Sequence, residues 1–195
     1  MSRFPHVHFL LSAADAAQFP ADVGAEVAFA GRSNAGKSSA INALTQRQGL
    51  ARTSKTPGRT RLINFFELAP AQRLVDLPGY GYASGPAEER SSWLPLIEAL
   101  RARQSLRGLF VIVDARRGLT AGDETLLSWA SPQQRLHVLL AKADKLSRSE
   151  ATAALRAAQA RLGERSGVQL FSALRGTGVR EAQDTLVAWL ASKGQ

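Results

Sequence analysis

The chain has 195 residues, of which 45% are hydrophobic, and it contains no cysteine. This length suits one well-buried domain and is too short for two of ordinary size. The lack of cysteine excludes disulfides, thiolate metal sites and cysteine nucleophiles, and it favours a reducing, cytoplasmic location. The formal net charge of +9 indicates a polyanionic partner, because lysine and arginine release counterions when they meet phosphates.

Residues 1–22 are expected to be an N-terminal extension, and residues 23–195 a single domain. The extension carries adjacent apolar residues at Phe9, Leu10 and Leu11, so it could add a leading strand or form a loose segment. No apolar run approaches the ~20 residues that a membrane span requires. We therefore expect no membrane anchor.

From residue 26 onward, short β-rich apolar runs alternate with longer segments of helical periodicity. This alternation is typical of βαβ units around a mostly parallel sheet. The link 69–72 is too short for a crossover, so the strands on either side should pair as an antiparallel hairpin. The predicted strands are 26–30, 62–68, 73–76, 109–114, 136–141 and 168–171, and the predicted helices are 37–45, 88–103, 121–130, 148–162 and 179–192.

A phosphate-binding loop directly follows the first of these strands, where the sequence matches G-x-x-x-x-G-K-S. Its glycines let successive backbone N–H groups converge on phosphate oxygens, and the next helix points its positive end at the anion. Lys37 can reach the β- and γ-phosphates, and the Ser38 hydroxyl is placed to ligate Mg²⁺. The predicted contacts are Gly31, Arg32, Ser33, Asn34, Ala35, Gly36, Lys37, Ser38 and Ser39.

The strand 73–76 ends in a D-x-x-G element made of Asp76, Leu77, Pro78 and Gly79. Asp76 can hold Mg²⁺ through a water, and the Gly79 N–H can sense the γ-phosphate and move when it leaves. Leu77 and Pro78 belong to the same predicted nucleotide contact.

Between these two motifs, residues 53–61 contain the glycine and proline expected of a switch loop. Such a loop supplies one threonine hydroxyl that completes the magnesium shell only while the γ-phosphate is present. Thr53, Thr56 and Thr60 all qualify on chemical grounds.

Two later elements indicate that the base is guanine. An A-K-A-D sequence after the strand 136–141 is close to the N/T-K-x-D motif, and the Asp144 carboxylate can accept from the guanine N1–H and exocyclic amine, a pairing that adenine cannot offer. The Lys142 stem would cover the base face. An F-S-A sequence after the last strand resembles the S-A-x element whose backbone N–H meets guanine O6. The predicted contacts are Ala141, Lys142, Ala143, Asp144, Phe171, Ser172 and Ala173.

Five elements thus follow one another in GTPase order at the ends of predicted strands. They predict an α/β, three-layer P-loop NTPase fold of the Ras-like G-domain type, with a mixed, mostly parallel sheet of about six strands and helices on both faces. A P-loop nucleotide kinase, the first rival, has no use for Lys142 and Asp144. A transporter-type ATPase would need a signature such as L-S-G-G-Q, which is missing.

The sequence resembles the EngB (YihA/YsxC) family of bacterial ribosome-assembly GTPases over nearly its whole length. The strings that carry the resemblance are G-R-S-N-A-G-K-S-S at 31–39, K-T-P-G-R-T at 55–60, N-F-F at 64–66 and D-L-P-G-Y-G-Y-A at 76–83. They are far more distinctive than the general GTPase motifs.

The resemblance implies a magnesium-dependent GTPase that acts in late assembly of the large ribosomal subunit and is needed for normal cell division and septation. It favours Thr60 among the three threonines, so that Ser38 and Thr60 ligate Mg²⁺, and it places Ser172 with Ala173 against the base. The family usually has threonine where this chain has Ala141, which removes a hydroxyl near the base. The implied GTP contacts in the switch loop are Gly58, Arg59, Thr60, Arg61 and Leu62.

Lys37, Thr60 and Gly79 are the predicted catalytic residues. Tyr80 stands where Ras-like proteins place the glutamine that orients the attacking water, so we expect slow intrinsic hydrolysis that a partner or an ion accelerates. Potassium-stimulated relatives carry asparagine at the position of Asn34, which suggests a K⁺ site there. The alternative is that asparagine simply tolerates tight loop geometry.

Residues 47–61 carry several basic side chains and no acidic one, so this loop could couple GTP binding to ribosomal RNA. We expect GTP and GDP as ligands, the large ribosomal subunit as partner, a monomer, and no DNA specificity. The alternative within the GTP-binding class is a scaffold of the division machinery without a direct ribosomal role.

Overall fold

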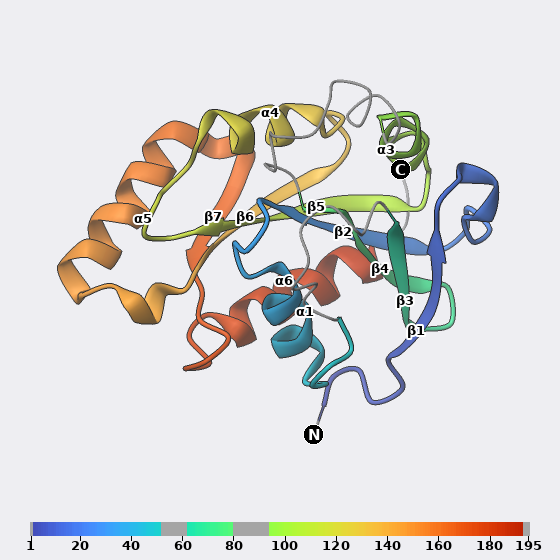
Figure 1. Cartoon of the computed structure of the whole chain (residues 1–195), viewed down its shortest axis with the longest axis horizontal. Coiled ribbons are helices and arrows are strands. Elements are labelled where there is room, and N and C mark those ends of the chain that lie inside the picture. The colour runs from blue at the N-terminus through green and yellow to red at the C-terminus, as the bar shows by residue number, and fades with distance from the viewer. Residues whose placement is uncertain (1, 52–61, 80–93, 193–195) are drawn as a thin grey trace.

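One mixed sheet forms the centre of the molecule (Figure 1). The computed structural model describes residues 2–51, 62–79 and 94–192, and within them the sheet has seven strands in the order β1-β3-β4-β2-β5-β6-β7. The strands are β1 (His8–Ala13), β2 (Ala25–Gly31), β3 (Ile63–Ala69), β4 (Gln72–Asp76), β5 (Leu106–Asp114), β6 (Arg135–Ala141) and β7 (Ser166–Leu170).

The strands β4, β2, β5, β6 and β7 are parallel to one another, whereas β3 pairs antiparallel with both β4 and β1. The hairpin predicted from the short link 69–72 is therefore confirmed, as is the mostly parallel sheet. The strand β1 comes from the N-terminal segment, for which the sequence left a strand and a loose segment equally open. It brings the sheet to one strand more than the predicted number.

Helices cover both faces of the sheet, as predicted. The bounds predicted for α1 and α5 match the structure, because each helix has a definite start: Gly36 precedes α1, and Ser147 and Glu150 form a capping box at α5. Of the predicted helix 88–103, residues 88–93 lie outside the described part of the chain, and the described helix ends at Arg101. The helices are α1 (Lys37–Thr45), α3 (Leu94–Arg101), α4 (Ala121–Trp129), α5 (Arg148–Leu162) and α6 (Val179–Ala191).

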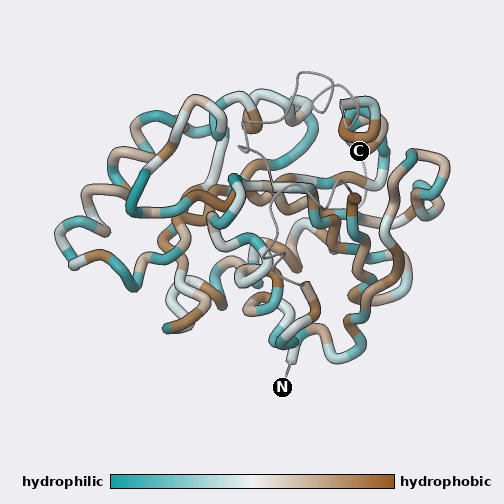
Figure 2. The backbone as a smooth tube through the Cα atoms, viewed as in Figure 1, coloured by the Kyte–Doolittle hydropathy of each residue, from teal (hydrophilic) through white to brown (hydrophobic). Residues whose placement is uncertain are grey.

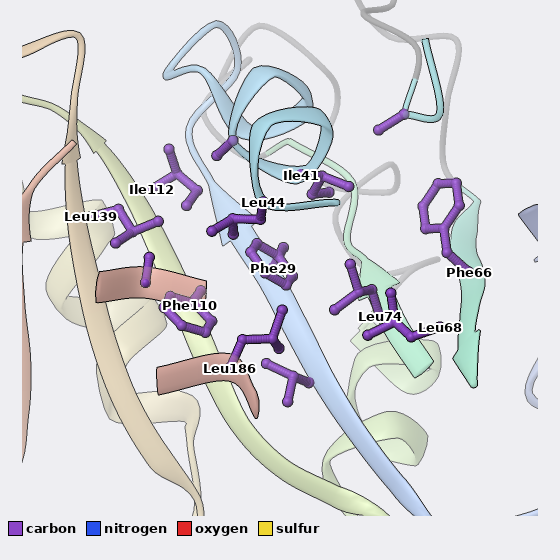
Figure 3. Packing of buried hydrophobic residues seen from close by; sticks show 14 of the residues in the cluster. Phe29, Ile41, Leu44, Phe66, Leu68, Leu74, Phe110, Ile112, Leu139 and Leu186 are labelled. Carbon is purple, nitrogen blue, oxygen red and sulfur yellow. The ribbon is translucent and has the colours of Figure 1, made fainter. Parts of the chain in front are cut away.

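The face covered by α1 and α6 has a core of stacked aromatic rings. Phe29 of β2 and Phe110 of β5 lie with ring centroids 5.1 Å apart and nearly parallel planes. Figure 3 shows Ile41 and Leu44 of α1 above these rings and Leu186 of α6 beside them. Each fully buried side chain of this size contributes about 1.5–3 kcal/mol.

The opposite face packs against α3, α4 and α5 through Leu100, Leu127 and Ala158. Every residue of β2 is buried, and the central strands are the brown, hydrophobic tube at the centre of Figure 2. A strand buried on both faces reads as a continuous apolar run, which is why the sequence pattern located β2, β5 and β6. None of the helices in the described ranges is long and apolar enough to cross a membrane.

A buried ion cluster ties together the amino-terminal ends of β2 and β4 and the segment before β5. The Glu26 side chain is fully buried, and its carboxylate accepts from Arg73 Nη1 at 3.0 Å, Arg103 Nε at 2.7 Å and Arg103 Nη2 at 2.8 Å. The same two arginines both donate to the backbone oxygen of Ala21. The segment before β2 is thus held against the edge of the sheet at which β2 and β4 begin.

We expect Glu26→Gln to lower the free energy of unfolding by about 3 kcal/mol, because it leaves the buried Arg73 guanidinium without a balancing charge and Arg103 with only Asp22, at 3.9 Å. Urea denaturation at a fixed nucleotide concentration measures this loss. The control is Glu98→Gln, which breaks the exposed pair with Arg101 and should cost no more than about 1 kcal/mol. Equal losses in the two variants would contradict a structural role for the cluster.

Candidate functional site

The loop between β2 and α1 has the backbone shape that phosphate binding requires. Gly36, the residue before α1, has a φ of 114°, which side-chain-bearing residues rarely adopt. At Gly31 a Cβ atom would lie 2.6 Å from the Ile112 carbonyl oxygen, so only glycine fits beside β5. The loop therefore turns sharply and leaves the first N–H groups of α1, which have no partner within a helix, facing the loop.

Lys37 brings the phosphate loop and the D-x-x-G element together. Its ammonium group contacts the Asp76 carboxylate at the end of β4, and both side chains are largely buried, at 13% and 8% exposed. Leu77 N donates to the Phe29 oxygen, so the chain follows β2 one residue past the end of β4. Gly79 then lies against the loop: a Cβ on it would be 3.2 Å from the Ser33 Cα atom.

The donor set around Lys37 suits magnesium. Asp76 contacts Lys37, and Ser38 follows Lys37 in the chain, so a carboxylate and a hydroxyl lie close to the same loop. Both are oxygen donors, which Mg²⁺ prefers, and it usually takes few protein ligands besides phosphates and waters. Within the described ranges, no group of three or more His, Cys, Asp or Glu residues could hold a metal.

The predicted switch residues Gly58, Arg59, Thr60 and Arg61 lie outside the described residues, as does Tyr80. Leu62 is described and partly buried, immediately before β3.

The structure joins the two predicted base-binding elements at the ends of β6 and β7. The Ser172 hydroxyl donates to Asp144 Oδ1 at 2.6 Å, and Ala143 N donates to the Phe171 oxygen at 3.1 Å. Ser172 N donates to the Thr177 oxygen at 2.9 Å. The Ser172 N–H is therefore already bonded within the protein.

The hydrogen bond from the Ser172 hydroxyl lowers the pKa of Asp144, with smaller help from Lys145 and Arg175. The carboxylate is consequently ionised at neutral pH and can act only as an acceptor. The prediction that Ser172 acts through its backbone near the base did not anticipate this side-chain contact.

Ala141, where the EngB-like sequences usually have threonine, is buried beneath the phosphate loop. A Cβ on Gly36 would lie 3.6 Å from the Ala141 Cβ atom. A threonine hydroxyl at this position would therefore lie near the phosphate loop as well as near the base.

Lys142 makes two contacts that the sequence did not predict. Its Nζ atom donates to the Asn34 carbonyl oxygen in the phosphate loop at 2.6 Å and to Asp114 Oδ2 at 3.0 Å. Asp114 also receives a bidentate pair from Arg116, with Nε to Oδ1 at 2.9 Å and Nη2 to Oδ2 at 2.7 Å. These bonds from Arg116, and then Lys142, hold the pKa of Asp114 far below its usual range.

Asp114 had no predicted role, although its position offered a signal. It is the last residue of β5 and stands opposite Ala141 in the parallel register, so it had to lie beside the A-K-A-D element. Next to it a cavity of about 310 Å³ opens beside the phosphate loop, with Arg32, Asp114, Arg116, Arg117 and Lys142 in its lining.

Comparison with known proteins agrees with this arrangement. Residues 26–142 match the family model described as "50S ribosome-binding GTPase". The chain is 51% identical to the probable GTP-binding protein EngB of Aeromonas hydrophila subsp. hydrophila over 95% of this chain and 88% of the relative. It is 50% identical to that of Azoarcus sp. over 97% of this chain and 94% of the relative.

The chain belongs to the EngB family of P-loop GTPases. Membership supports guanine-nucleotide binding and GTP hydrolysis in general, and GTPases of this kind use Mg²⁺. It confirms the family resemblance drawn from the sequence strings.

Solved structures share the fold. A crystal structure of a probable GTP-binding protein EngB superposes with a TM-score of 0.66 at 19% identity, covering 87% of this chain and all of that one (100%). A structure of Era in complex with MgGDPNP and nucleotides 1506–1542 of 16S ribosomal RNA gives 0.63 at 20% identity, covering 88% of this chain and 58% of that one. The predicted P-loop GTPase fold is therefore confirmed.

We predict that Ser172→Ala raises the pKa of Asp144 toward its ordinary value, because the variant lacks the hydroxyl that donates to the carboxylate. A pKa that is lowered by folding stabilises the protein above the unfolded-state pKa, and this contribution is lost as the pH falls through the folded-state pKa. In the variant this contribution should therefore be smaller, and its loss should be complete at a higher pH.

Carboxyl ¹³C NMR titration measures this shift. Glu150 serves as an internal control, because its pKa is lowered by another hydroxyl, that of Ser147 at the start of α5. An unchanged Asp144 titration, with Glu150 also unchanged, would contradict the assignment.

Proposed function

We propose that the chain is a Mg²⁺-dependent, GTP-hydrolysing switch that acts in assembly of the large ribosomal subunit. The observation that carries the proposal is one sheet edge that unites the Lys37–Asp76 pair with the Asp144–Ser172 pair. The first pair suits a triphosphate with its metal, and the second suits a guanine base. In open α/β sheets, nucleotides bind at this edge, outside the carboxyl ends of the parallel strands.

Base selection in this proposal rests on Asp144. Its ionised carboxylate would accept from both N1–H and the exocyclic amine of guanine, while Ala173 N–H meets O6. An adenine in the same place would leave the carboxylate without a donor, which is costly in a partly desolvated site. The Ser172 hydroxyl fixes one carboxylate oxygen and so orients the other toward the base.

For hydrolysis, Lys37 would stabilise charge on the β- and γ-phosphates, and the Gly79 N–H would contact the γ-phosphate. Mg²⁺, held by Ser38, Thr60 and a water on Asp76, would neutralise the developing charge. Tyr80 cannot orient the attacking water as a glutamine does, so the intrinsic rate should be slow. The roles of Thr60 and Tyr80 rest on the sequence alone.

Asn34 is a candidate for a K⁺ that raises the rate. The side chain sits in the phosphate loop, and the residue has a φ of 62°. That conformation is also one that asparagine tolerates better than most residues, so the simple geometric explanation stands beside the potassium one. Equal turnover in potassium and sodium buffers would remove the K⁺ site from the proposal.

Ribosomal partnership has support of a different kind. The matched family model is described as ribosome-binding, the Era structure carries ribosomal RNA, and this chain has a net charge of +9. A cytoplasmic location, a monomeric state and the downstream need for the protein in cell division belong to the same proposal.

Calorimetric titration with GDP, XDP and ADP tests the guanine assignment. We expect Asp144→Asn to weaken GDP binding by about 100-fold, because the carboxylate makes charge-assisted hydrogen bonds to two donors. The same variant should bind XDP more tightly than the wild type does, because an amide can donate to the xanthine oxygen. The control Asp184→Asn changes an exposed carboxylate on α6 and should leave all three affinities unchanged. Equal affinity of the wild type for ADP and GDP would overturn the assignment.

Sedimentation with purified ribosomal subunits tests the partner. We expect the protein to travel with large-subunit particles in the presence of a non-hydrolysable GTP analogue and to be released with GDP, because the switch loop responds to the γ-phosphate. Raising the salt concentration should weaken this binding if phosphates are contacted. Identical binding with the analogue, GDP and no nucleotide would show that the switch is not coupled to the particle.

A further inference from the structure

The peptide bond between Asn34 and Ala35 is held at both ends. Its carbonyl oxygen accepts from Lys142 Nζ at 2.6 Å, and its N–H donates to the Arg32 oxygen at 3.0 Å. Asn34 has a φ of 62°, a region that few side-chain-bearing residues occupy without outside support. The shape of the phosphate loop just before Gly36 therefore depends on where the Lys142 ammonium group lies.

The Lys142 ammonium is itself directed by Asp114. The Asp114 side chain is 8% exposed, and Arg116 occupies both of its oxygens from one side. This bidentate pair fixes the plane of the carboxylate and leaves Oδ2 facing Lys142 Nζ at 3.0 Å. A flexible four-carbon side chain that would otherwise sample many rotamers is thereby confined to one place.

The turn after β5 does not rest on the Asp114 side chain alone. The turn after β5 is closed by the Asp114 backbone oxygen, which accepts from Arg117 N at 2.9 Å and Gly118 N at 3.2 Å. Replacing the side chain leaves both of these bonds in place. What it removes is the charged contacts to Arg116 and to Lys142, together with the bond that Oδ1 accepts from Arg116 N at 3.1 Å.

We propose that Asp114, oriented by Arg116, is a positioning residue for nucleotide binding: it places the Lys142 ammonium on the Asn34 carbonyl and so couples the base-binding element to the shape of the phosphate loop. This inference rests on the proposed guanine-nucleotide site. Asp114 touches neither base nor phosphate in this scheme and acts through Lys142.

A double-mutant cycle on affinity for the fluorescent nucleotide mant-GDP tests the coupling. We expect Asp114→Ala to weaken binding by roughly 10- to 100-fold in the otherwise wild-type chain, the range for loss of a charge-assisted hydrogen bond. In the Lys142→Ala chain the same change should weaken binding by less than about 3-fold, because the residue through which Asp114 acts is gone. Equal losses in both chains would overturn the proposal.

Arg116 and Arg117 provide a matched pair of controls. Both line the same cavity, and removing either changes the net charge equally, but only Arg116 bonds to the Asp114 carboxylate. We expect Arg116→Ala to weaken mant-GDP binding several-fold and Arg117→Ala by less than about 2-fold. In the Lys142→Ala chain the two should have the same small effect.

The outcomes separate this inference from the function on which it rests. A wild-type chain that binds no mant-GDP would remove the proposed function. A wild-type chain that binds it, with Arg116→Ala and Arg117→Ala equally harmful, would remove only the role of Asp114. Should Asp114→Ala fail to fold, as judged by circular dichroism and thermal unfolding, the Arg116 and Arg117 variants decide the question.

Discussion

Parallel pairing of β4, β2, β5, β6 and β7 is the constraint on which the site depends. Strands that run in the same direction end at the same edge of the sheet. Strand direction alone therefore brings residues that are far apart in the sequence close together there. Gly31, Asp76, Asp114 and Ala141 are each the last residue of their strand. The loops that leave this edge begin at fixed, neighbouring positions. Side chains from different loops can therefore contact one another over short distances.

Burial of the central strands fixes the positions of their carboxyl ends. The central strands are covered on both faces, with aromatic rings against α1 and α6 and aliphatic side chains against α3, α4 and α5. A small displacement of one strand would open voids on both sides at once, and close-packed interiors resist such displacement. The ion cluster around Glu26 holds the amino-terminal ends of β2 and β4 to the segment before β5. The site therefore sits on a rigid support, and the parts proposed to move with nucleotide are the loops.

Much of this arrangement follows from local sequence signals. The start of α1 was predictable because Gly36 and Lys37 belong to a motif whose geometry is fixed, and β2, β5 and β6 because strands buried on both faces are apolar throughout. The strand β1 was not, since its half-exposed pattern is ambiguous and its partner β3 lies far along the chain. The contact of Lys142 with Asn34 spans 108 residues, and nothing in either motif indicates it. The hydrogen bond from the Ser172 hydroxyl to Asp144 is likewise not indicated by either of the motifs that contain these residues.

The position of β1 has a consequence for how the chain is made. It is synthesised before the other six described strands, yet His8 pairs with Glu67 and Ala13 with Ile63, on a strand that is synthesised later. Chains emerge from the N-terminus, and contacts between distant segments form slowly because a long loop must first close. The β1 segment must therefore wait, unpaired and carrying apolar residues such as Phe9, until β3 has been synthesised.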